Sequence, residues 1–572
     1  MILAKNHLTD FKVVISKNAT PEEKHAAHEL RQFLRAVSGT TFPLYDDGAE
    51  ITGPAILFGS AQNPNRHIDT DCAGLGEEGF VIKTSGDRLI IAGNKPRGAM
   101  YGVYGFLEDF VGIRFYTKDF TYIPKREILK IPDNIDDTQI PVLEYRDPYY
   151  GQNFDPDWHL RNKSNTTMSN LEIMHGGKMK YVGFVHTFDS LVPVETYFDD
   201  HPEYYSMING ERIKKYTQLC LTNPEVLKIA IAGVRKWLME NPDANIVSVS
   251  QNDWINPCEC PECAAIDAAE GAKSGSLLYF VNKIAEDIER DYPNLIIDTL
   301  AYQYTRKPPK NIRPRKNVAV RLCSIECCFA HPLSECTANA SFAAQNWTQT
   351  NFNSFDSDLK GWAKICERLH IWDYVTNFAN YLSPFPNFNV LKKNIEYFID
   401  NNATGIFEEG NTAGDQAVEL NHIRQYLLAK LLWNPGLDAE RIMDEFISIY
   451  FGGAAQAIKE YIGLIHEQIT PDTHMGIYDS PKREYYPASM AERADILFDR
   501  AEMLADDEQV LHRVKLCRLS VYYLKMARMP LGEERNAAVD FLIDGAAYYG
   551  ITQIREGRGI EEWREYLKTR DI

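Results

Sequence analysis

The chain has 572 residues, which is too long for a single hydrophobic core, so two or three domains are expected. Its net charge of −19 argues against binding to nucleic acid or anionic membranes, because both need basic patches that neutralise phosphate. The sequence contains no run of about 18 apolar residues, so no membrane span is predicted. The first ten residues include Lys, His and Asp, unlike a signal peptide, so we expect a protein that stays inside the cell or one whose signal was removed.

Residues 1–135 are predicted to form a small α/β domain. The segment FKVVIS alternates as a strand, and Asn18 or Thr20 then starts an amphipathic helix that Gly39 ends. A hairpin turning at 85–87 and a second helix, PRGAMYGVYGFLEDFVG, follow.

Eight apolar runs come next, and each breaks off into Asp, Glu, His, Tyr, Trp or another polar residue. They are LEYRDPYY at 143–150, YVGFVHTF at 181–188, YTQLCLTN at 216–223, NIVSVSQND at 245–253, LIIDTLAYQY at 295–304, NVAVRLCSIEC at 317–327, RLHIWDYVTNF at 368–378 and ATGIFEEGN at 403–411. Helix-compatible stretches separate most of them, and this alternation predicts a (β/α)₈ TIM-type barrel over residues 136–414. Strand character is lost afterwards, so a helical domain is expected over 415–572.

The carboxylates at the strand ends are the candidate catalytic groups, because barrel active sites lie at the C-terminal ends of the strands. Glycosidic bonds are usually cleaved by two carboxyl groups, although some enzymes use the substrate's own acetamide as nucleophile beside a single acid. The candidates are Asp253, Glu326, Glu408 and Glu409. Neighbours in a strand point to opposite sides, so only one of Glu408 and Glu409 is expected to face the axis. We favour Glu409, because the glycine after it permits close approach of a ligand.

Other polar and aromatic residues at the run ends are candidates for sugar binding. They are His186, Asn252, Tyr302, Tyr304, Trp372 and Asp373. Each also has a purely structural interpretation, as a core aromatic residue, a hydrogen-bonded histidine or a salt-bridge partner.

The cysteines cluster in two segments, CECPEC with Cys258, Cys260 and Cys263, and CSIECCFAHPLSEC, which includes His331. Both segments follow strand ends on the same face, so three thiols of the first could meet a thiol or His331 of the second around a structural zinc. A disulfide and reduced structural thiols are the alternatives. No cofactor is predicted for catalysis.

The stretch QNDWINPCECPECAAIDAAEGAKSGSLLYFVNKIAEDI, with LAYQYTRKPP and VRLCSIECCFAHPL, resembles the bacterial family first described as domain of unknown function 4838. Part of that family became glycoside hydrolase family 163, endo-β-N-acetylglucosaminidases acting on N-glycans. Residues 10–133 also resemble the non-catalytic α/β domain that precedes the barrel in hexosaminidases and α-glucuronidases. By analogy, Glu409 or Glu408 would be one catalytic carboxyl group and Glu326 or Asp253 the other.

The sequence therefore predicts a retaining glycoside hydrolase that cleaves a β-N-acetylglucosaminide with help from the substrate acetamide. An α-glucuronidase-like hydrolase is the second enzyme hypothesis, since Arg146 and Arg321 lie in the runs and could bind a substrate carboxylate. A non-catalytic carbohydrate-binding protein on a barrel scaffold is the third. The expected partner is a carbohydrate, and no oligomeric state is predicted.

Overall fold

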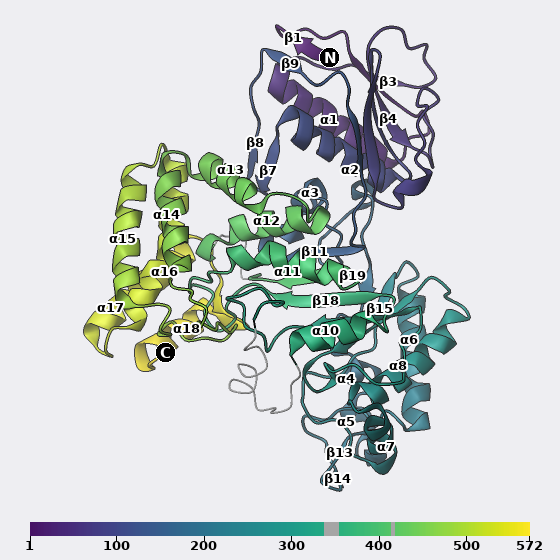
Figure 1. The fold of residues 1–572 in the computed structure, drawn as a ribbon, viewed down its shortest axis with the longest axis vertical. Helices are drawn as coiled ribbons and strands as arrows, with labels where there is room; N and C mark the ends of the chain where they lie inside the picture. The colour runs from purple at the N-terminus through teal and green to yellow at the C-terminus, as the bar shows by residue number, and fades with distance from the viewer. Residues whose placement is uncertain (337–353, 413–417) are drawn as a thin grey trace. The chain divides into compact units, whose positions relative to one another are not determined.

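The computed structural model describes residues 1–336, 354–412 and 418–572 (Figure 1). The chain forms two compact units. The first comprises residues 1–144, 150–178 and 422–449, and the second comprises residues 145–149, 179–421 and 450–572. The predicted helical segment 415–572 is thus shared between the two units. In the described ranges, no helix is both long enough and apolar enough to cross a bilayer.

The first unit is built on a six-stranded sheet of order β10-β5-β6-β4-β2-β3. Its main strands and helices are β2 (Lys12–Ile15), α1 (Pro21–Ser38), β3 (Leu44–Asp46), β4 (Ala55–Ser60), β5 (Phe80–Ser85), β6 (Arg88–Gly93), α2 (Pro96–Phe106), β10 (Asp136–Gln139), α3 (Pro156–Arg161), and most of α12 (Asn421–Trp433) and α13 (Ala439–Phe451). Two smaller pairs, β1 (Ile2–Lys5) with β9 (Ile128–Lys130) and β7 (Arg114–Thr117) with β8 (Phe120–Tyr122), complete it.

The predicted elements of this unit are confirmed, because their signals are local. Thr20 caps α1 in a capping box with Glu23, and Gly39 ends the helix with a left-handed φ of 76°. The hairpin forms at the predicted turn, since Ser85 pairs with Arg88 across the antiparallel strands β5 and β6.

The second unit is built on a curled sheet of seven parallel strands in the order β11-β19-β18-β17-β16-β15-β12. The strands are β11 (Tyr145–Tyr149), β12 (Tyr181–Val182), β15 (Ile246–Ser248), β16 (Ile296–Ala301), β17 (Val318–Cys323), β18 (Leu369–Tyr374) and β19 (Ala403–Glu409). Seven of the eight predicted runs supply them. The prediction for the third run was wrong: residues 216–223 are all described and add no strand to this sheet, because β12 pairs directly with β15.

A buried arginine shows that the sheet curls around a common interior. The Arg321 guanidinium on β17 lies 5.0 Å from the Tyr145 ring on β11 and 5.3 Å from the Tyr181 ring on β12, although these strands are the two edges of the sheet. Its Nε donates to Asp298 Oδ2 on β16 at 3.4 Å, and both side chains are fully buried. One ion pair with an aromatic shell therefore holds both edges of the half-barrel.

Helices cover this sheet and continue beyond it (Figure 1). They are α4 (Phe188–Leu191), α5 (Val194–Tyr197), α6 (Pro224–Glu240), α7 (Pro261–Glu270), α8 (Ser274–Glu289), α10 (Phe355–Ala363), α11 (Phe388–Asp400), α14 (Ala455–His466), α15 (Ala488–Met503), α16 (Glu508–Ala527), α17 (Glu533–Tyr548) and α18 (Ile560–Thr569). Helices α16, α17 and α18 pack with the hairpin of β20 (Gln553–Arg555) and β21 (Arg558–Gly559) around one hydrophobic core. This core includes Leu382, from the loop after β18. This core fixes the hairpin beside the C-terminal end of β18.

Replacing Arg321 with Met should lower the free energy of unfolding by about 3–5 kcal/mol, because Asp298 would be left as an uncompensated buried charge. Denaturant titration measures this loss. The double variant Arg321→Met, Asp298→Asn should recover part of it, since the stranded charge is then removed. Arg290→Met, at an exposed ion pair with Asp287, is the matched control and should change stability by less than about 0.5 kcal/mol. An Arg321→Met protein as stable as this control would contradict the role assigned to the pair.

Candidate active site

Glu409 ends β19 on the interior face of the curled sheet. It lies two residues beyond Phe407, whose ring is 5.8 Å from the Arg321 guanidinium, and alternation therefore places both side chains inside. Trp372 Nε1 donates a hydrogen bond of 2.7 Å to Glu409 Oε2. Burial, opposed by this hydrogen bond and reinforced by the charges of Glu556 and Asp253, raises the pKa of Glu409 to about 8. Glu409 is thus a carboxylic acid that keeps its proton at neutral pH.

Asp253 follows β15 in a loop and is the second carboxyl group of the site. Tyr302 donates its phenolic hydrogen to Asp253 Oδ1 at 3.0 Å, and His186 Nε2 lies 4.0 Å from the same oxygen. The Asp253 side chain is 58% exposed. Asp253, Tyr302 and His186 therefore form one polar group that reaches solvent. The charge of Asp253 contributes to the raised pKa of Glu409.

Glu556 is a third carboxyl group of the site and is not among the residues predicted from the sequence. It lies at the turn between β20 and β21, and its backbone N–H donates to Phe378 O at 2.9 Å. Burial and the charge of Asp253 raise its pKa. No local signal distinguishes this glutamate from other turn residues, because it reaches the site only through the packing of the C-terminal helices.

The aromatic side chains that are open to a ligand differ from those predicted. Trp372 is only 8% exposed and stacks on Phe184 at 5.6 Å, so it positions Glu409 and is not a free platform. Trp254, next to Asp253, is 44% exposed and contacts the Tyr216 ring edge-on at 4.8 Å. Tyr478 is half-exposed. Its partial burial, and then the charges of Glu556, Glu409 and Asp253, raise the pKa of its phenol.

The structure places Glu326 in a buried ionic network. Arg306 donates from Nη1 to Glu326 Oε2 at 3.1 Å and from Nε to Asp358 Oδ2 at 2.8 Å. All three side chains are at most 3% exposed. Glu326 is therefore an ion-pair partner that holds the loop after β17, which argues against its candidacy as the second catalytic carboxyl group.

Asp373 and Glu408 form a separate acidic pair on the outer face of the sheet. The two residues are partners in the register of β18 and β19, and each is next to an interior residue, Trp372 or Glu409. Burial and the charge of Asp373 raise the pKa of Glu408 well above its usual value, and burial raises that of Asp373 to about 6. Alternation along the strands thus separates Glu408 and Asp373 from Glu409, against the expectation that Asp373 lines the mouth.

Two predicted sugar-binding residues have other partners. The Asn252 amide accepts from Asp189 N at 2.9 Å and donates to Thr217 O at 3.0 Å, so both its ends are used within the protein. Tyr304 lies near Asp267 of α7, whose charge, after burial, raises the pKa of the phenol. The structure therefore assigns Asn252 to loop positioning and places Tyr304 beside α7.

Six of the eleven cysteines lie in two groups, whereas the sequence predicted a single group. Cys258, Cys260 and Cys263 lie with Cys220 from the third run, while His331 lies with Cys328, Cys336 and His474. All eleven cysteines of the chain are described, and none is in a disulfide.

The second unit is a parallel half-barrel with Asp253, Glu409 and Glu556 near the C-terminal ends of its strands, where the active sites of barrel enzymes lie. The chain belongs to the family described as Domain of unknown function (DUF4838), whose model matches residues 115–463, more than half of the chain. Residues 3–106 match the model described as Glycosyl hydrolase family 67 N-terminus. The resemblance of the sequence to the family first described as domain of unknown function 4838 is thus confirmed. A comparison with curated proteins gave no match.

Solved structures match this chain at low sequence identity. A 4-O-methyl-α-glucuronidase of family GH115, with specificity for decorated arabinogalactans, matches with a TM-score of 0.59 and 11% identity, covering 100% of this chain and 80% of its own. A GH138 enzyme targeting pectin rhamnogalacturonan II has a TM-score of 0.45, with 98% of each chain covered, and CpGH84B has 0.46, with 98% and 97% covered; both are 11% identical. The shared fold rests on the first of these.

The buried acids make stability depend on pH in a defined direction. A folded-state pKa above the unfolded value gives stability that is complete below about pH 4.5, the ordinary pKa of a glutamate, and that is lost as the pH rises through the folded pKa. Glu408→Gln removes one such acid. Relative to the wild type, it should therefore gain at least about 1 kcal/mol of unfolding free energy between pH 5 and pH 8.5. Urea titrations at both pH values test this, and a pH-independent difference would contradict the burial argument.

Proposed function

We propose that the protein is a retaining glycoside hydrolase that cleaves a β-linked N-acetylglucosaminide, with Glu409 as general acid and the substrate acetamide as nucleophile. The observation that carries the proposal is the buried Glu409, whose pKa is raised to about 8, together with the exposed Asp253 carboxyl group, whose charge acts on it at the C-terminal ends of the strands. Two carboxyl groups in different environments are what acid-assisted glycoside cleavage needs.

Glu409 suits the role of general acid because the position of its proton is defined. Trp372 Nε1 can only donate, and the carbonyl oxygen of a carboxylic acid is its better acceptor, so we assign that oxygen to Oε2 and the acid proton to Oε1. From Oε1 the proton can pass to the glycosidic oxygen as the bond breaks, and Oε1 can then take a proton back from the water that opens the cyclised intermediate.

Asp253 suits the group that orients the acetamide. Its Oδ1 is fixed by Tyr302, and the exposure of the side chain leaves room for a substrate N–H to donate to the carboxylate. Hydrogen bonding to Asp253 would hold the acetamide oxygen toward the anomeric carbon and stabilise the positive charge that develops on the ring that forms. Trp254 and Tyr216 offer exposed rings for stacking on a sugar face.

The charge of the site favours a neutral sugar. The charge of Asp253 already raises the pKa of both Glu409 and Glu556, and the charge of Glu556 also raises that of Glu409, so a substrate carboxylate would add to the repulsion. Arg321, considered as a cation for such a carboxylate, is fully buried and paired with Asp298. The fold shared with the GH115 enzyme supports the competing α-glucuronidase assignment. In that case Arg146 would be the cation that binds the substrate carboxylate, but its side chain is buried, at 1% exposure.

Glu409→Gln should lower kcat on an aryl β-N-acetylglucosaminide by at least about 100-fold, because the amide keeps the shape but cannot deliver a proton. In the wild type, kcat should fall above about pH 8, since the acid then loses its proton. Steady-state kinetics from pH 5 to pH 9.5 measure both effects.

Glu408→Gln is the matched control, since it makes the same chemical change one residue earlier on the opposite face of β19. Its kcat should stay within about threefold of the wild type. If Glu408→Gln were inactive and Glu409→Gln active, Glu408 and not Glu409 would be the general acid. Full activity of Glu409→Gln would contradict the acid role, and sugar binding without any turnover by the wild type would favour the non-catalytic alternative.

A thiazoline derived from N-acetylglucosamine should inhibit the wild type at concentrations at least about 100-fold below KM, because it mimics the cyclised intermediate that the site stabilises. Competitive inhibition assays test this, with 4-O-methyl-glucuronides as the comparison substrates. Turnover of the glucuronides without thiazoline inhibition would replace the acetamide mechanism by the α-glucuronidase assignment.

A further inference from the structure

We propose that the chain holds two structural zinc ions, each in a closed four-ligand site. The first site is made by Cys220, Cys258, Cys260 and Cys263, and the second by Cys328, His331, Cys336 and His474. In each group the four ligand atoms lie within 4.8 Å of one another. A zinc with bonds of about 2.3 Å to sulfur holds its sulfur ligands about 3.8 Å apart, so both groups have the size of a tetrahedral site.

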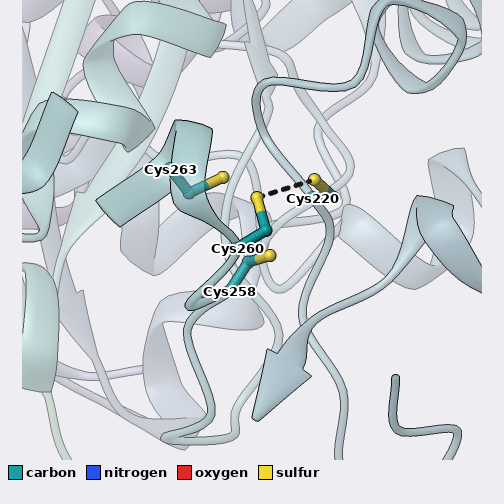
Figure 2. Close-up of side chains that lie close together, drawn as sticks. All are labelled: Cys220, Cys258, Cys260 and Cys263. Atoms are coloured by element: carbon teal, nitrogen blue, oxygen red, sulfur yellow. Dashed lines mark hydrogen bonds between the residues drawn. The ribbon is translucent and has the colours of Figure 1, made fainter. Parts of the chain in front are cut away.

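The first site consists of four buried thiols that converge from two segments (Figure 2). Cys220 Sγ lies 3.6 Å from Cys260 Sγ, which is the spacing of two ligands on one metal and far from a disulfide bond of about 2.05 Å. Cys260 immediately precedes α7 and Cys263 lies in its first turn, where the helix dipole favours thiolates.

The surroundings of the first site donate hydrogen bonds to sulfur. Cys258 Sγ receives the backbone N–H of Met207 and Nη1 of Arg212, both at 3.5 Å. Thr222 Oγ1 lies 3.2 Å from Cys263 Sγ. Donors aimed at thiolates are the outer shell that a zinc site requires, because they spread the negative charge of four sulfur ligands.

The third apolar run acquires a role from this site. Gln218, two residues before Cys220, donates from Nε2 to Asn252 O at 2.8 Å and to Trp254 O at 2.5 Å, and its Oε1 accepts from Asn252 N at 2.8 Å. This clamp holds the loop that carries Asp253 on both sides. A metal bound by both Cys220 and Cys258 would join the same two segments at a second point.

The second site rests on a different observation, the tautomer of His331. Its Nε2 lies 3.0 Å from Thr470 O, and a carbonyl only accepts, so Nε2 carries the hydrogen. In the neutral ring Nδ1 therefore presents its lone pair, and it lies 3.7 Å from Cys328 Sγ. A histidine whose outer nitrogen donates to a backbone carbonyl is set for metal binding through the other. His474 Nδ1 lies 3.8 Å from Cys336 Sγ and completes the group.

The second site would tie the loop after β17 to the segment that carries Tyr478. That segment already lies along the mouth, since Phe329 N donates to Met475 O at 2.9 Å and Phe378 N donates to Ile477 O at 2.8 Å. On binding, each thiol ligand gives up its proton to solvent and the histidines stay neutral, so the two sites would release up to six protons in all.

The experiment measures metals in the full-length chain, purified without chelators from zinc-supplemented medium. Elemental analysis should give about two zinc ions per chain, about one in Cys260→Ser, about one in His474→Ala and none in the double variant. Cys72→Ser, which changes a buried cysteine outside both groups, is the matched control and should keep about two. Fewer than about 0.2 zinc ions per wild-type chain, or iron in place of zinc, would overturn the proposal.

X-ray absorption at the zinc edge keeps the proposal testable if a variant fails to fold. The wild type should show an average of about three sulfur and one nitrogen ligands, and His474→Ala should show about four sulfur ligands at about 2.3 Å. A zinc shell of oxygen and nitrogen alone would mean adventitious binding and would overturn both sites.

Hydrogen exchange then tests what each metal holds, without reference to any activity. Amides in 249–258 should exchange at least about tenfold faster in Cys260→Ser, and amides in 475–480 should do so in His474→Ala, while the other segment stays at the rate of Cys72→Ser. Unchanged exchange in both segments would contradict the positioning roles.

Discussion

The buried Arg321–Asp298 pair is the interaction on which the second unit depends. A guanidinium in this interior is stable only if it is paired and enclosed, and Asp298 and the rings of Tyr145 and Tyr181 meet both needs. Because those rings come from the two edge strands, satisfying one charge also sets the curvature of the sheet. The curvature brings the ends of β15, β16, β18 and β19 to a common mouth.

The same low-polarity interior sets the chemistry of that mouth. Burial makes ionisation costly for Glu409, and the acidic neighbours Asp253 and Glu556 make it costlier, so the proton is retained. Trp372 partly offsets this effect and orients the acid. The cost in stability at high pH and the proposed general-acid role therefore have one physical origin.

Loops at the mouth need separate supports, because a parallel sheet fixes only where its strands end. Arg306 holds the loop after β17 through Glu326, and Gln218 holds the loop after β15 through the backbone on both sides of Asp253. Cys258 lies further along the loop after β15, and Cys328 lies further along the loop after β17. The amide clamp thus acts directly on the loop of Asp253, the residue proposed to orient the substrate.

The sequence by itself determined seven strands, the helix that Thr20 and Gly39 bound, and the alternation that separates Glu409 from Glu408, because hydrophobic period, capping and strand geometry are local properties. It could not show that residues 216–223 form a loop clamp, since their apolar pattern matches that of a buried strand. Only tertiary structure decided that Glu326 is neutralised by Arg306 and that Glu556 joins the site. Whether a carboxylate is paired, buried or open depends on groups distant in the chain, and burial and pairing are what set its pKa.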